Sequence, residues 1–329
     1  MKTRITELLG LKYPILCGGM MNLCKVELCA AVSNAGGLGN LTAANYPSGK
    51  DLANAIREVR KRTDQPFWVN VTLLPALQFS EENYVDFFET IAEQRVPAVE
   101  IGGTPLDRFK DGMYLRKLKE AGVKLIHKVG SVRHAVHCEH AGYDAILAAG
   151  VEEGGHPLND NVATSVLTPR IAESVRIPVV TAGGMADGRG LAAALSLGAE
   201  GIMMATRFIC TKECVVHENV QNEIIRRQEY ETTLYGNSIG LQGRALLNET
   251  MRKVLEIEKR GGGLGEILPL IAGTIGPRIW QEGDTSAGSI NVGQSIGLIH
   301  DVMTCKDLIE QIVREAEEVI AKVKEKLEV

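Results

Sequence analysis

A glycine-rich loop holds the residue with the clearest capacity for chemistry. Residues 150–160 read GVEEGGHPLND, and the one imidazole in this loop belongs to His156. Imidazole titrates near neutral pH, so His156 is suited to act as a catalytic acid or base or as a hydrogen-bond donor to a substrate. A histidine that only caps its loop is the alternative. Glycines let a ligand approach the backbone closely, and we therefore favour an active-site role.

Two consecutive segments are typical of a phosphate site. They are PVVTAGGMADGRG at 178–190 and GIMMATRF at 201–208. N–H groups of Gly183 and Gly184 after the first segment, with a helix N-terminus after the second, would hold a dianion. The chain has no Gly-x-Gly-x-x-Gly fingerprint and no Gly-Lys-Ser/Thr phosphate loop. The phosphate of FMN or of a sugar phosphate is therefore favoured over that of a dinucleotide or ATP.

Lys128 is the second candidate for catalysis. It lies near the end of the apolar run LIHKV, where its ammonium would stabilise an anionic reduced flavin or a substrate oxyanion. The alternative is a lysine that extends its charge to the surface. Its neighbour His127 should face the other side of the strand, and we interpret His127 as structural.

Composition restricts the class of protein. The 329 residues are 45% hydrophobic and 23% charged, with a formal net charge of -5 and no block of like charge. Nucleic acid and anionic membrane are poor partners for such a chain, and no apolar stretch approaches the ~18 residues of a membrane span. The N-terminus lacks a signal-peptide cleavage site, so we expect a cytoplasmic protein. The seven cysteines form no CxxC pair, which favours reduced thiols and predicts no metal site.

The elements that position these residues alternate regularly. Strands are predicted at 14–19, 38–43, 67–72, 98–103, 124–129, 145–150, 178–184 and 201–208, with amphipathic helices between them. Eight such units predict an α/β TIM barrel; an open doubly wound sheet is the alternative. We assign residues 1–211 and 289–329 to the barrel and residues 212–288, which are charged and strand-poor, to a small mainly helical domain. The predicted C-terminal helix spans 306–328.

The chain resembles the FMN-dependent nitronate monooxygenase superfamily. The resemblance rests on PILCGGM, AAVSNAGGLGNLTA, PFWVNVTLLP, GVKLIHKVGSVRHA, GGHP, AGGMADGRGLAAALSLGAEGI, ATRFICTKECVVH and QEGDTSAG. Within the superfamily, the chain looks most like the NADH:quinone reductase branch. It implies non-covalent FMN at the strand ends, with His156 as the active-site histidine and Lys128 in contact with the flavin. The other flavin-binding positions that it implies are Gly19, Met20, Met21, Asn70, Ala182, Gly183, Gly184, Ala205 and Thr206.

Some positions depart from the family pattern. The reductase branch has glutamine and tryptophan where this chain has Met21 and Asn22. The family has glycine where this chain has Leu158 and Trp68, and it has Gly-Thr where this chain has Ala205-Thr206. Phosphate binding relies on backbone N–H groups and survives these changes. We expect the acceptor pocket to differ in shape near Met21, Asn22, Trp68 and Leu158.

Residues and resemblance together predict an FMN oxidoreductase. It would take hydride from NADH or NADPH and pass it to a small-molecule acceptor that is quinone-like or unsaturated. Nitronate monooxygenation with O₂ and FMN-dependent enoyl-thioester reduction are two alternatives. A non-catalytic flavin- or phosphate-binding protein is a third. A homodimer is an open possibility.

Overall fold

The computed structural model describes residues 1–74 and 79–327. Two residues named above fall outside this part: Pro75, which ends the segment PFWVNVTLLP, and Glu328, the last residue of the predicted C-terminal helix. Among the described helices, none combines the length and the apolar character that crossing a membrane requires.

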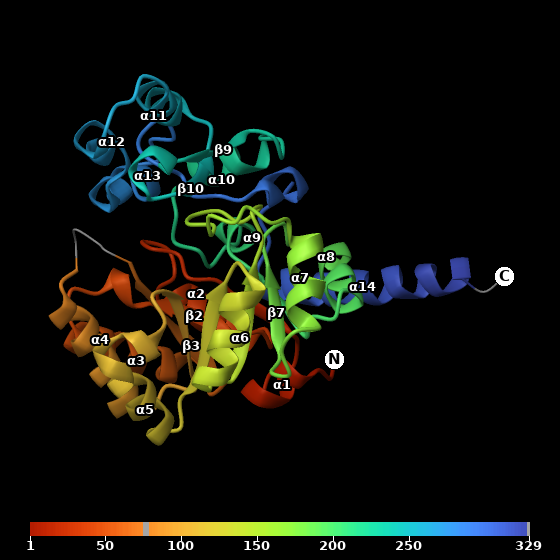
Figure 1. Cartoon of the computed structure of the whole chain (residues 1–329). Coiled ribbons are helices and arrows are strands. Elements are labelled where there is room, and N and C mark those ends of the chain that lie inside the picture. Colours follow the sequence, from red (N-terminus) through yellow and green to blue (C-terminus); the bar gives the residue numbers. More distant parts are fainter. Residues whose placement is uncertain (75–78, 328–329) are drawn as a thin grey trace.

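Eight parallel strands form the barrel, as predicted (Figure 1). Their order is β1-β8-β7-β6-β5-β4-β3-β2, and a parallel bridge between Leu16 and Leu38 joins the first strand to the second. The strands are β1 (Ile15–Cys17), β2 (Gly39–Thr42), β3 (Phe67–Leu73), β4 (Ala98–Gly103), β5 (Lys124–Val129), β6 (Ala145–Ala149), β7 (Val179–Ala182) and β8 (Gly201–Met204).

The last strand is shorter than predicted. β8 ends at Met204, whereas the sequence pattern extended it to Phe208. At Ala205 the backbone leaves the extended conformation (φ -121°, ψ -63°), and the short helix α9 (Thr206–Ile209) follows. The apolar side chains of this segment therefore pack as a helical turn against the core, which a hydrophobicity pattern alone does not distinguish from a strand.

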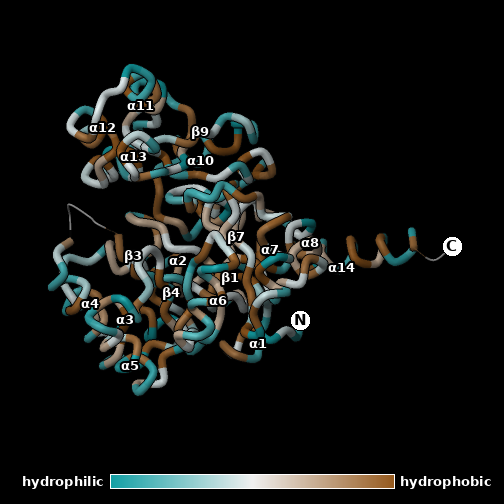
Figure 2. The backbone as a smooth tube through the Cα atoms, viewed as in Figure 1, coloured by the Kyte–Doolittle hydropathy of each residue, from teal (hydrophilic) through white to brown (hydrophobic). Residues whose placement is uncertain are grey.

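Helices surround the barrel and close one end of it. α1 (Arg4–Leu9) places Ile5 and Leu9 in the core inside the barrel, at the amino ends of the strands. The surrounding helices are α2 (Val26–Asn34), α3 (Gly49–Arg62), α4 (Glu81–Glu93), α5 (Met113–Glu120), α6 (Val132–Ala141), α7 (Thr164–Ala172), α8 (Gly188–Ser196) and α14 (Cys305–Leu327). α14 packs against α8 and α2 and then extends beyond the barrel (Figure 1). Hydrophobic and hydrophilic residues alternate along that extension (Figure 2).

A small domain lies over the carboxyl ends of the strands (Figure 1). Its helices are α10 (Glu218–Ile225), α11 (Glu249–Lys259), α12 (Leu264–Ile271) and α13 (Gly276–Trp280). It also contains an antiparallel hairpin of β9 (Thr232–Tyr235) and β10 (Gly243–Leu246). The sequence analysis, which interprets this region as strand-poor, does not predict this hairpin. The hairpin matters because Arg244 in β10 pairs with Gly155 in the histidine loop.

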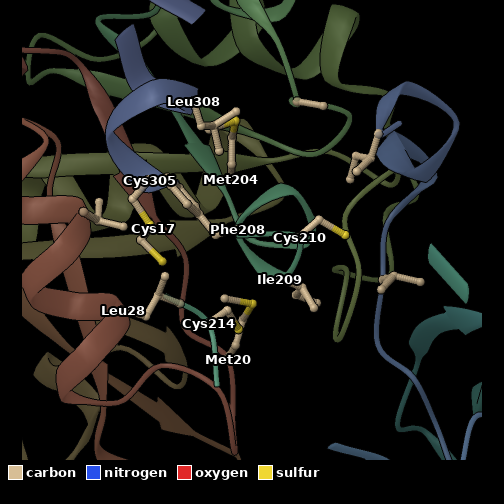
Figure 3. Packing of buried hydrophobic residues seen from close by; sticks show 14 of the residues in the cluster. Cys17, Met20, Leu28, Met204, Phe208, Ile209, Cys210, Cys214, Cys305 and Leu308 are labelled. Atoms are coloured by element: carbon tan, nitrogen blue, oxygen red, sulfur yellow. The ribbon is translucent and has the colours of Figure 1, made fainter. Parts of the chain in front are cut away.

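The cysteines serve as small core residues. All seven are buried and free, in agreement with the prediction of reduced thiols. Cys17, Cys210, Cys214 and Cys305 pack with Phe208 and other apolar side chains where β1, α9 and α14 meet (Figure 3). Burial raises the pKa of Cys210 to about 12, so this thiol stays protonated near neutral pH.

Candidate active site

The predicted site residues gather at the carboxyl end of the barrel. Gly19 and Met20 follow β1, Asn70 lies in β3 and Lys128 lies in β5. The Gly183-Gly184 pair follows β7, and Ala205 and Thr206 follow β8. Because parallel strands present their carboxyl ends at one rim of a barrel, segments more than 180 residues apart in the sequence share one surface.

Lys128 fastens the histidine loop. Its Nζ lies 2.9 Å from Oε1 of Glu153 and donates a second hydrogen bond of 3.0 Å to the backbone carbonyl of His156. The side chains of the ion pair are only 16% and 9% exposed. Burial lowers the pKa of Lys128, but Glu153 and Glu100 outweigh it and hold that pKa above its usual value. Lys128 is therefore a fixed cation beneath the loop, and the exposed-lysine alternative does not describe it.

Two buried carboxyl groups accompany Lys128, and the sequence analysis did not select either. Burial raises the pKa of Glu153 and of Glu100, while Lys128 opposes the rise in both. Glu100 accepts a 2.7 Å hydrogen bond from the amide of Asn70. Asn70 in turn lies against Gly19, where any side chain would meet its amide at 2.4 Å. The signal that could have identified Glu100 is an acidic residue inside the apolar strand AVEIGG.

His156 presents its imidazole to solvent. The side chain is exposed, yet the protein around it and the charge of Lys128 lower its pKa to about 4. Burial and the charge of Lys128 both lower the pKa, while the accessible part of the ring keeps its hydration and offsets part of the effect of burial. The ring is therefore neutral near pH 7. A neutral imidazole offers one N–H donor and one acceptor nitrogen.

The small domain holds the histidine loop from the other side. Gly155 and Arg244 exchange two backbone hydrogen bonds of 3.0 and 2.6 Å. The guanidinium of Arg244 donates to the carbonyl of Val151 at 2.9 Å. Glu152 accepts hydrogen bonds from the backbone N–H and the hydroxyl of Thr164 at the start of α7. The loop is thus tied to β5, α7 and β10, and Arg244 is a positioning residue that the sequence did not reveal.

The β7–β8 rim fits a phosphate. Gly183 and Gly184 adopt left-handed backbone conformations (φ 96° and 74°). Within the described residues, their N–H groups and that of Thr206 donate no hydrogen bond to the protein. A side chain at Gly184 would meet no protein atom nearer than 3.8 Å. Free N–H groups beside open space suit an anion, so these residues fit the phosphate of FMN. The hydroxyl oxygen of Thr206 accepts a 3.0 Å hydrogen bond from Gly293, which fixes the rim.

The positions that depart from the family pattern lie in different places. The N–H of Asn22 donates to the amide oxygen of Asn45, and Asn22 adjoins Gly276 of the small domain. Leu158 folds against Gly130 after β5. Trp68 is fully buried inside the barrel, where its Nε1 donates to the Cys17 carbonyl at 2.9 Å. Trp68 therefore stiffens the barrel core and does not line an open pocket, contrary to the expectation above.

The Lys128–Glu153 pair gives a testable prediction. Glu153→Gln keeps the shape of the side chain but leaves the Lys128 ammonium without its nearest counter-charge. Removing one partner of a buried pair is strongly destabilising, so we expect a loss of about 3 kcal/mol of unfolding free energy. Chemical denaturation followed by circular dichroism measures it.

An exposed ion pair is the matched control. Glu249 and Lys253 form an i,i+4 pair on α11 with both side chains more than half exposed. Glu249→Gln should change the unfolding free energy by less than about 0.5 kcal/mol. Equal effects of the two substitutions would show that Lys128 does not depend on Glu153.

The model of the family described as nitronate monooxygenase matches residues 2–315. The chain belongs to the nitronate monooxygenase family. Enzymes of this family are flavin-dependent oxidoreductases, and the free N–H groups of the rim after β7 and β8 are compatible with a phosphorylated cofactor.

Proteins with different names resemble the chain. A Rhodococcus jostii protein named (3aS,4S,5R,7aS)-5-hydroxy-7a-methyl-1-oxo-octahydro-1H-indene-4-carboxyl-CoA dehydrogenase is 32% identical, over 96% of each chain. A Staphylococcus saprophyticus protein named probable nitronate monooxygenase is 31% identical, over 97% of this chain and 99% of its own. FabK from Thermotoga maritima has 38% identity and a TM-score of 0.90, with 99% of each chain covered.

Proposed function

We propose that this family member is an FMN-dependent oxidoreductase that takes hydride from NADH or NADPH and reduces a carbon–carbon double bond conjugated to a thioester carbonyl. The observation that carries the proposal is His156: a neutral, accessible imidazole on a loop fixed by Lys128 and Arg244. Bound FMN would supply the hydride relay between nicotinamide and acceptor.

A neutral imidazole suits an acceptor that develops charge on oxygen. Hydride addition to the β-carbon of an enoyl thioester moves an electron pair onto the carbonyl oxygen. An N–H donor fixed in place stabilises that oxygen without first losing a charge of its own, and Lys128 supplies a positive field beneath the loop. The α-carbon then takes its proton from solvent. A quinone develops similar charge, so His156 alone does not separate the two acceptors.

The relatives favour the thioester over the quinone. The Rhodococcus jostii relative is named for a CoA thioester, and the FabK chain aligns along nearly its whole length at 38% identity. The Gly-Gly-His loop and the Ala-Gly-Gly strand also resemble those of the family's FMN-dependent enoyl-carrier reductases. The name of the Staphylococcus saprophyticus relative supports nitronate oxidation as the alternative function. That reaction differs from the proposed one in that it needs no nicotinamide.

Turnover with matched substrates tests the proposal. We expect NADH or NADPH to reduce the bound flavin and a 2-enoyl-CoA to reoxidise it rapidly without oxygen. The 3-enoyl-CoA isomer is the control, because its double bond is not conjugated to the carbonyl, and it should reoxidise the flavin no faster than buffer. Rapid oxidation by a quinone with no response to 2-enoyl-CoA would favour quinone reduction. Oxygen-dependent turnover of alkyl nitronates without nicotinamide would replace the proposal altogether.

A further inference from the structure

A second cluster of ligand-type side chains lies on the outer face of the barrel wall, away from the flavin rim. His127 of β5 meets His134 and Cys138 of α6, and their ligand atoms all lie within 4.8 Å of one another. We propose that these three side chains bind a zinc ion between β5 and α6. The site is independent of the proposed reaction, and it reverses the expectation from the sequence that the chain holds no metal.

The imidazoles of this cluster lack hydrogen-bond partners. His127 is fully buried, yet neither of its ring nitrogens makes a hydrogen bond, and Nε2 of His134 is buried and unpaired as well. Burial lowers the pKa of His127, and a contact with the Gly103 backbone opposes that shift. The ring thus has a polar backbone neighbour, but neither ring nitrogen has a partner at both the distance and the angle of a hydrogen bond. A buried unsatisfied donor or acceptor is destabilising, and proteins rarely leave two adjacent rings in this state. A metal ion would bind one nitrogen of each ring.

The spacing of the ligands suits chelation. His134 and Cys138 are four residues apart and therefore lie on one face of α6. The rings of His127 and His134 meet edge to face with centroids 4.8 Å apart. Ligand atoms of a tetrahedral zinc site are about 3.5 Å apart, given Zn–N and Zn–S bonds of about 2.0 and 2.3 Å. Closing the cluster requires movements of roughly 1 Å, within the reach of side-chain rotation. His134 is partly exposed, which gives an ion a route in.

A carboxylate stands next to the cluster as a further ligand or as a hydrogen-bond partner. Oδ1 of Asp107 is buried without a partner, while its Oδ2 lies 2.8 Å from Nε2 of His137. Burial lowers the pKa of His134 and raises that of Cys138, and the charge of Asp107 acts upward on both, against burial at His134 and with it at Cys138. Tyr143 accepts a 2.7 Å hydrogen bond from the N–H of Leu106 and so fixes this segment beside the cluster. Two imidazoles, one thiolate and a nearby carboxylate form a donor set that zinc favours.

Zinc binding should release a proton from the thiol. Burial raises the pKa of Cys138 to about 12, whereas burial lowers the pKa of His127 to about 3. The ring is therefore already in its ligand form near pH 7, and only the thiol must lose a proton to the metal.

The test uses the full-length flavin-loaded protein, freed of metal with a chelator under reducing conditions and then given equimolar Zn²⁺. We expect one zinc per chain after gel filtration. X-ray absorption at the zinc edge should show one sulfur at about 2.3 Å and nitrogens at about 2.0–2.1 Å. This measurement is insensitive to flavin absorbance. Bound zinc without a sulfur ligand, or protein that retains no zinc, would overturn the proposal.

Substitutions on α6 locate the ion. His134→Ala and Cys138→Ser should each weaken zinc binding by at least about 100-fold, since each removes a ligand outright. His140→Ala is the control, because His140 is exposed on the same helix, and it should leave zinc affinity unchanged. Circular dichroism and flavin content report whether each variant folds. If a variant does not fold, the zinc-edge spectrum of the parent protein decides alone. Equal zinc binding by parent and folded variants would place the ion elsewhere and contradict the assignment.

Discussion

His156→Ala should slow flavin reoxidation by the enoyl acceptor by about 10²–10³-fold, the effect of removing one fixed hydrogen-bond donor to a developing oxyanion. Flavin reduction by NADH should stay near the parent rate, because hydride donation to the flavin depends on proximity and needs no charge stabilisation by this ring. Stopped-flow absorbance measures the two half-reactions separately. Parent rates in both steps with FMN fully bound would leave His156 a structural residue of its loop.

A conservative variant separates the chemical role of His156 from a positional one. His156→Gln keeps a neutral N–H donor and should recover part of the rate that alanine loses. The pKa of His156 is lowered to about 4, so the ring stays neutral as the pH rises from about 5.5 to 8. The acceptor step of the parent should therefore be flat across that range. A histidine acting as an acid with an ordinary pKa near 6.5 would instead lose rate as the pH rises through it.

Gly184→Val should abolish FMN binding while the barrel still folds. Gly184 combines a φ of 74° with open space in front of its Cα. A valine would strain the backbone and fill the space that the phosphate needs. Flavin content after gel filtration, compared with circular dichroism, checks the result. Full flavin occupancy in the variant would move the phosphate site away from β7.

Gly122→Val controls for backbone strain alone. Gly122 has a similar φ of 81°, and an added Cβ would meet no neighbouring atom within 4 Å, but it precedes β5 at the opposite end of the barrel. We expect this variant to lose stability, since a β-branched residue is unfavourable at positive φ, yet to keep its FMN. Loss of FMN from both variants would indicate general destabilisation instead of a local cradle.

The barrel was predictable from sequence because each strand repeats the same short-range pattern. Apolar runs that end in glycine, alternating with amphipathic helices, specify parallel strands and place their ends at one rim. Each strand boundary was predicted within a few residues except that of β8, where one apolar segment contains both a strand end and the helical turn of α9. Glycine pairs at the strand ends indicated the phosphate rim for the same local reason.

The supports of the site were not predictable, because they depend on contacts between distant segments. Glu153 was visible in the sequence, but its pairing with Lys128 requires β5 and the loop after β6 to meet. Arg244 belongs to a short hairpin, and the strand pattern of this hairpin is not recognisable among the many charged residues of its region. The pairing of His127 with α6 depends on how that helix packs against its strand. No single-sequence pattern reports such geometry.

The attachment of the histidine loop to β10 bears on the order of events during synthesis. Val151 and Arg244 are 93 positions apart, so a ribosome-bound chain that has released all eight strands still lacks Arg244. Contacts of such long range form late, after the loop-closure entropy between them has been overcome. The glycines after β7 can therefore be in place in the nascent barrel before His156 acquires its final orientation. The rim as a whole is completed later still, because Gly293, which fixes Thr206, follows Arg244 in the chain.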